Sequence, residues 1–154
     1  MADTIGGGIN EDGSLQNTIV IDEADLGKID IVRLENAQVT EVAVNSPIKD
    51  LQLGLKGDNA VAIAGARLVD AVITNEAPAG KTAKFTLAVT KAKSLNFVTT
   101  GKGSTDLTVA EGRFMKGSIT TAKGNAPDSV TFGPASTLKS VAISTGKGAD
   151  SLTF

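Results

Sequence analysis

The sequence predicts an all-β fold, a short parallel β-solenoid of about six rungs with a period near 22 residues. Related segments recur at that period in the last third of the chain. Each segment alternates apolar with polar or small residues, and β-branched Thr, Val and Ile are abundant in it. No stretch carries a sustained helical apolar stripe. An antiparallel β-sandwich is the alternative, but it gives no reason for one side chain to recur at one rung length.

The recurring segments combine an aspartate with the apolar-Thr-apolar triplet that follows it. The aspartates are spaced by 22 and 22 residues, and the triplets by 23 and 22. In a parallel solenoid, equivalent residues of neighbouring rungs stack about 4.8 Å apart, so like apolar groups form columns. The expected stacking columns are Phe97, Ile119 and Ile143; Leu107, Val130 and Leu152; and Val109, Phe132 and Phe154.

The repeat extends upstream in weaker form. Apolar pairs at 51–53, 61–63 and 85–87 match the same strand pattern, and 29–31 lies 22 residues before 51–53. A shorter Arg-apolar-apolar patch begins at Arg67 and again at Arg113, 46 residues later. We therefore expect residues 18–154 to form a single β-repeat domain.

Residues 1–17 lack the repeat and are rich in Gly and Asn. They are predicted to form either an N-terminal arm that lies on a neighbouring subunit or a disordered tail, since soluble solenoids need their ends covered. The start has an early acid and no apolar core, so we expect no signal peptide and synthesis as a soluble cytoplasmic chain. The longest apolar run, 60–66, is too short for membrane insertion.

The composition excludes several kinds of chemistry. The chain has no Cys, His, Trp or Tyr, which rules out a thiolate nucleophile, a His general base and a zinc or haem site built on His or Cys. Charges nearly cancel, with 15 Lys+Arg against 17 Asp+Glu, so we expect no nucleic-acid partner. No catalytic or cofactor-binding residue is predicted, and the protein is expected not to be an enzyme.

The aspartates offer one possible ligand site. The stretch from Thr145 to Thr153 resembles the haemolysin-type (RTX) nonapeptide, in which Thr145 stands in place of the first Gly. The residues at the other motif positions are Gly146, Gly148, Asp150 and Leu152. The resemblance implies Ca²⁺ binding by the aspartates. The alternative is that each aspartate closes a turn and faces a lysine. The aspartates are Asp106, Asp128 and Asp150, and the lysines are Lys102, Lys123 and Lys147.

In overall character the chain resembles small accessory proteins of tailed-phage virions. The shared features are a Met-Ala start, richness in Ala, Thr, Val and Gly, the lack of Cys, and short β-repeats. This resemblance implies a structural subunit for capsid decoration or an appendage, at a virion or extracellular assembly surface. Its partners would be other protein subunits, with the chain itself a homo-oligomer, expected to be a trimer. The alternative is a secreted or cell-surface calcium-binding β-solenoid of the RTX or S-layer type.

Overall fold

A computed structural model gives the architecture of the chain. It describes residues 3–4, 18–21, 31–34, 41–44, 48–56, 60–65, 67–121 and 124–154. Side chains are described for residues 51–54, 60–65, 67–121 and 124–154. Among these residues the chain is all-β, and no helix could cross a membrane.

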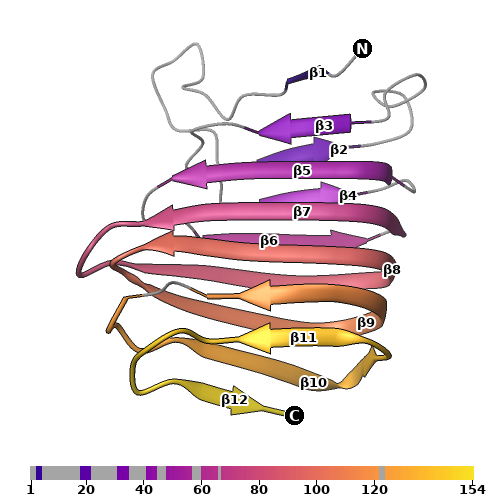
Figure 1. Ribbon diagram of the computed structural model, residues 1–154. Coiled ribbons are helices and arrows are strands. Elements are labelled where there is room, and N and C mark those ends of the chain that lie inside the picture. Colours follow the sequence, from indigo (N-terminus) through magenta and orange to yellow (C-terminus); the bar gives the residue numbers. More distant parts are fainter. Residues whose placement is uncertain are drawn as a thin grey trace.

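The described residues form twelve strands, which follow one another along the chain (Figure 1). Their bounds are β1 (Asp3–Thr4), β2 (Thr18–Ile21), β3 (Ile31–Leu34), β4 (Glu41–Val44), β5 (Ile48–Lys56), β6 (Ala60–Gly65), β7 (Leu68–Ala77), β8 (Thr82–Gly101), β9 (Ser104–Thr120), β10 (Ser129–Leu138), β11 (Val141–Ser144) and β12 (Ser151–Thr153). Every pairing between them is parallel.

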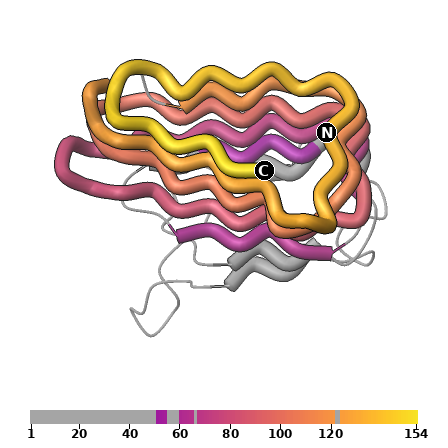
Figure 2. The backbone as a smooth tube through the Cα atoms, turned by 90° about the horizontal axis from the view of Figure 1, so that it is seen from below, coloured from indigo at the N-terminus to yellow at the C-terminus, as the bar shows by residue number. Residues whose placement is uncertain are grey.

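The predicted parallel β-solenoid is confirmed. A rung consists of one strand on each of two facing sides, as in β6 with β7, or of one long strand that bends around both sides, as in β8 and β9 (Figure 1). Figure 2 looks along the stack and shows a flattened rung with two long sides. The residues with described side chains make up about four turns with a period of about 23 residues.

The period is not constant along the chain. β7 and β8 pair with an offset of 24 residues, and β8 and β9 pair with 22 or 23. Between β3 and β5 the offset is only 19, because Val32 lies opposite Leu51 and Leu34 lies opposite Leu53. The expected match of 29–31 with 51–53 is therefore wrong. A fixed spacing of 22 loses register in the early rungs, because the offset between paired strands varies there from 19 to 29.

The strand register places residues of the expected apolar columns opposite one another. Phe97 lies opposite Ile119, which lies opposite Ile143. Leu107 lies opposite Val130, and Val130 opposite Leu152. The third column also forms, with Val109 opposite Phe132 and the ring of Phe154 stacked on Phe132 at 5.2 Å between centroids.

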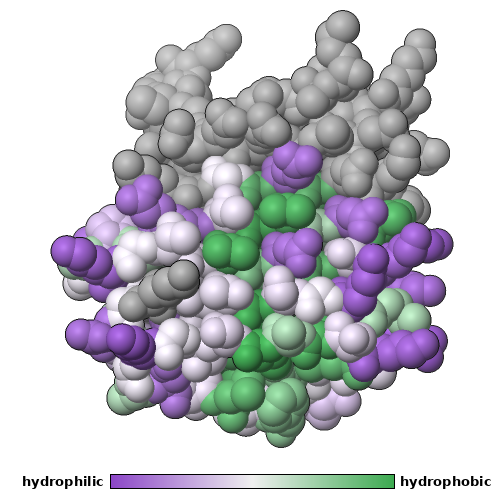
Figure 3. Space-filling model, viewed as in Figure 1, coloured by the Kyte–Doolittle hydropathy of each residue, from purple (hydrophilic) through white to green (hydrophobic). Residues whose placement is uncertain are grey.

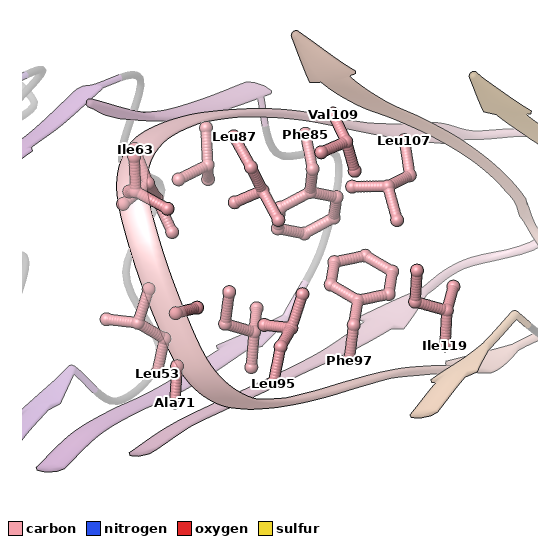
Figure 4. Close-up of a cluster of buried hydrophobic side chains, with 14 of the residues drawn as sticks. Leu53, Ile63, Ala71, Phe85, Leu87, Leu95, Phe97, Leu107, Val109 and Ile119 are labelled. Carbon is pink, nitrogen blue, oxygen red and sulfur yellow. The ribbon is translucent and has the colours of Figure 1, made fainter. Parts of the chain in front are cut away.

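These columns fill the interior from both sides of the rung. In Figure 4, Phe85, Leu87 and Val109 point inward from one side, and Leu53, Leu95 and Phe97 point inward from the other. The rings of Phe85 and Phe97 meet edge to face, 4.9 Å apart at an interplanar angle of 82°. Both rings are almost completely buried. Edge-to-face aromatic pairs contribute about 1 kcal/mol beyond the burial of their apolar area.

The two Arg-apolar-apolar patches mark one corner of the solenoid. Leu68 lies opposite Ala92 and Ala92 opposite Phe114, so the 46-residue spacing spans two rungs as the sequence predicts. These three side chains are buried and the arginine before each patch is exposed. The chain turns here from one side of the rung to the other, at the right edge of Figure 1.

The N-terminal region is described only in part. Asp3 and Thr4 form β1 and pair with Val32 and Arg33 of β3. The remainder of 1–17 lies outside the described residues, so the arm that reaches a neighbouring subunit stays a prediction. The domain boundary at residue 18 stays a prediction too.

Candidate functional site

The polar end of each rung holds the residues that the sequence singled out. It lies at the turns opposite the Arg67 corner, where 78–81 and 101–103 connect the strands. Each turn stacks on the preceding one, since the backbone N–H groups of Lys102 and Gly103 both donate to the carbonyl of Ala77, at 3.1 and 3.0 Å. A side chain at Gly101 would collide with that carbonyl, because its Cβ would lie 2.2 Å from the oxygen.

Asp128 is the most deeply buried of the described aspartates at the polar end. Its Oδ1 accepts a hydrogen bond from the backbone N–H of Thr105 at 2.7 Å, and its Oδ2 accepts one from the Thr121 hydroxyl at 2.7 Å. Only 2% of the residue is exposed. Burial raises the pKa of this carboxyl above its ordinary value, although the bonds from Thr121 and Thr105 oppose the rise.

Asp150 repeats the arrangement one rung further on. Its Oδ1 accepts a hydrogen bond from the backbone N–H of Asp128 at 3.1 Å. Each carboxylate therefore binds the N–H group of the equivalent residue in the preceding rung, which is Thr105 for Asp128 and Asp128 for Asp150. The negative charge of Asp150 adds to the rise in the pKa of Asp128. The two aspartates thus extend the ladder of hydrogen bonds between rungs at the point where the strand begins.

Asp106 does not belong to this column. It lies opposite Ser129 in β10 and opposite Lys84 in β8, whereas the position of Asp128 is taken by Thr105 in the β9 rung. The register between β9 and β10 is 23 residues rather than 22 here, which moves Asp106 one place along the strand. The structure therefore brings Asp128 and Asp150 together and leaves Asp106 on the other face of the strand.

Among the described residues, three threonines complete the polar end, and nothing in their spacing or surroundings in the sequence distinguishes them from other threonines. The hydroxyls of Thr99 and Thr105 share a hydrogen bond of 2.7 Å across one rung, and Thr121 pairs with Asp128 in the next. All three are buried. Threonines occupy both exposed and buried positions in β8, where Thr86 and Thr100 are exposed and Thr99 is buried, so a threonine alone does not reveal which face it occupies.

The arrangement supports hydrogen bonding between rungs. Both oxygens of Asp128 already accept bonds, and the described residues contain no group of three or more Asp, Glu, His or Cys side chains that could hold a metal ion. Calcium binding by Asp106, Asp128 and Asp150 stays a prediction. Of the three lysines expected to face the aspartates, Lys102 and Lys147 are exposed, and Lys123 lies outside the described residues.

The rung of β11 and β12 forms a second candidate surface. Leu152 and Phe154 are 46% and 79% exposed, although each continues an apolar column that is buried in the preceding rungs. Beside them lies an open hollow of about 440 Å³, lined by Phe132, Gly133, Pro134, Ser136, Leu138 and Phe154. Apolar residues gather over this region at the bottom of Figure 3.

Comparison of the chain with protein-family models, with curated proteins and with solved structures found no significant match.

Proposed function

We propose that this chain is a non-enzymatic structural subunit that docks on a larger assembly, and more specifically a decoration or appendage protein of a phage virion. The observation that carries the proposal is the exposed apolar edge of the β11–β12 rung. Its partners would be other protein subunits at a virion or extracellular assembly surface, with further copies of the chain, three in all, forming a homo-oligomer.

The apolar columns support this proposal because they are left incomplete on one side. Val130 is buried, while Leu152 below it in the same column is nearly half exposed. Ile143, opposite the buried Ile119, is itself only partly buried. A further rung or a subunit surface placed against β11 and β12 would remove these side chains from water, which favours association by about 25 cal/mol per Å² of apolar area.

The backbone of the same edge supports docking by strand pairing. In the described part of the chain, β12 pairs with β10 alone and β11 with β9 alone. Their other edges have no strand partner among the described residues. Such an edge is a template for pairing with another chain, and strand addition provides main-chain hydrogen bonds together with pockets for alternate side chains.

Co-purification in a fixed ratio is the first test of the proposal. The tagged chain should elute with larger particles at constant stoichiometry. Leu152→Asp should prevent that association, because it places a charge in the apolar edge. Val72→Asp is the matched control, since Val72 is also a partly exposed apolar residue, 38% exposed, but lies in β7, away from this edge. A monomer that enters no assembly, or equal behaviour of the two variants, would contradict the proposal.

A further inference from the structure

A cluster of six cations occupies the corner where the rungs turn between their two sides. We call it the basic corner. Hydrophilic side chains gather at this edge, the right edge of Figure 3. All but Lys91 are exposed, and Lys91 is partly so. The basic corner consists of Arg67, Lys91, Lys93, Arg113, Lys116 and Lys139.

The parallel register stacks these charges on one another. Lys91 lies directly opposite Arg113, and Arg67 occupies the equivalent place in the preceding rung, next to Leu68. Neighbouring strands are about 4.8 Å apart, and like charges opposite each other destabilise a sheet. Asp70 and Glu111 are the acids close in sequence to the cluster. No ion pair is found for the six cations within the described residues. Within the described residues, the repulsion between these cations is therefore not compensated by an ion pair.

The cations also surround a groove. An open hollow of about 570 Å³ is lined by Arg67, Lys91, Lys93, Met115, Lys116, Lys139 and Ser140. The residues that line this hollow come from four successive rungs. A hollow bordered by cations from several rungs suits an extended acidic segment better than a single small anion.

The aromatic residues argue against single-stranded nucleic acid as the occupant. Proteins that bind it without sequence preference stack bases on aromatic side chains. The chain has no Trp or Tyr, and of its five Phe residues four are buried inside the rungs. The fifth, Phe154, stacks on Phe132. The basic corner offers charge without a stacking surface, which favours an acidic protein segment.

The chain itself carries such a segment. Residues 1–58 contain 11 Asp and Glu against 4 Lys and Arg, whereas residues 59–154 contain 6 against 11. The segment 22–30, between β2 and β3, holds four acids and one lysine. Because the rungs stack in chain order, β2 and β3 lie toward one end of the solenoid and the basic corner toward the other (Figure 1). Because acidic residues predominate toward one end of the solenoid and basic residues toward the other, contact between the acidic region of one copy and the basic region of another is favoured.

We propose that the basic corner docks the acidic segment 22–30 of a second copy of this chain. This inference rests on the proposed function, since it says how copies of a structural subunit recognise each other. Charge pairing would set the orientation of the copies, while the apolar edge of the β11–β12 rung would be covered separately.

Salt-dependent association of the full chain tests the inference. Sedimentation velocity should show oligomers at about 0.05 M NaCl that dissociate at about 0.5 M, where exposed charges are screened. The triple variant Lys91→Glu, Lys93→Glu, Lys116→Glu should weaken association at least about tenfold. The matched control, Lys84→Glu, Lys102→Glu, Lys147→Glu, changes net charge equally away from the corner and should associate as the wild type does.

Charge exchange makes the test specific to the segment. A variant with Asp22→Lys, Glu23→Lys and Asp25→Lys should also fail to associate alone, and mixing it with the corner variant should restore association. Three outcomes overturn the inference: association unaffected by salt and by corner reversal, a salt-dependent melting temperature in a chain that stays monomeric, or salt-reversible binding of a poly-dT oligonucleotide by a monomer. None of these removes the proposed function, which is tested separately by fixed-ratio co-purification and by the comparison of Leu152→Asp with Val72→Asp.

Discussion

The apolar interior and the polar end of the same rungs follow different rules of stacking. In one apolar column Phe85, Leu107 and Val130 succeed one another, so any aliphatic or aromatic side chain of suitable size is accepted. At the polar end, by contrast, the buried Thr and Asp side chains form hydrogen bonds with particular partners across the rung. Thr105 pairs with Thr99, and Asp128 pairs with Thr121. Apolar contacts depend on volume, whereas buried hydrogen bonds depend on donor, acceptor and distance.

Truncation in the apolar interior is expected to have the largest effect. Phe97→Ala would remove a completely buried ring and its edge-to-face contact with Phe85, leaving a cavity that the neighbouring rungs cannot fill. We expect a loss of about 3–5 kcal/mol in the free energy of unfolding, measured by urea denaturation. Phe154→Ala is the control, because that ring is 79% exposed, and should cost about 1 kcal/mol. Equal losses would mean that the last rung is as well packed as the centre.

Removal of the buried carboxylate should have the next largest effect. Asp128→Ala would leave the Thr105 N–H and the Thr121 hydroxyl without their acceptor in a buried place. Each unsatisfied buried group costs about 1–3 kcal/mol, so we expect a total loss near the lower end of the Phe97→Ala range. Asp150→Ala should cost less, because Asp150 is only partly buried and accepts a single described bond. If Asp150→Ala proves the more harmful, the polar end is not organised around Asp128.

The apolar columns were predictable from the sequence because spacing and residue type agree in them. Phe97, Ile119 and Ile143 differ by the length of one rung, and only the interior accepts such side chains repeatedly. The Asp column was predicted with one member too many. A rung that is one residue longer places Asp106 beside Ser129, and equal spacing of aspartates hides this shift.

Other features of the structure could not be predicted from the sequence. Thr99, Thr105 and Thr121 became recognisable only through their hydrogen bonds, since the sequence has threonines on both faces of its strands. The basic corner was also hidden, because the near balance of charge over the whole chain conceals how unevenly the charge is distributed along it. Residue spacing predicts what stacks, but not which polar groups meet across a rung.

The pH dependence of the free energy of unfolding should separate the contribution of the polar end from that of the apolar interior. The pKa of Asp128 is higher in the folded than in the unfolded chain, because burial disfavours the charged form. Between the ordinary aspartate pKa, about 4, and the higher folded value, the folded protein binds more protons, so its stability falls as pH rises. Asp128→Asn should remove this part of the pH dependence. A difference between wild type and variant that grows as pH falls below 4 would contradict the assignment.

Calcium is expected to have the smallest effect of all, and it separates the structural proposal from the calcium-binding alternative. Asp128 already accepts hydrogen bonds at both oxygens, and Asp106 lies opposite Ser129 instead of in the Asp128–Asp150 column. A cation bound at Asp128 would therefore compete with the hydrogen bonds that join the rungs. We expect millimolar Ca²⁺ to leave the melting temperature unchanged in calorimetry, with Mg²⁺ and chelator as controls. A marked rise that is lost in Asp150→Ala would instead support a secreted or cell-surface calcium-binding module, in which the ion replaces those hydrogen bonds as the link between rungs.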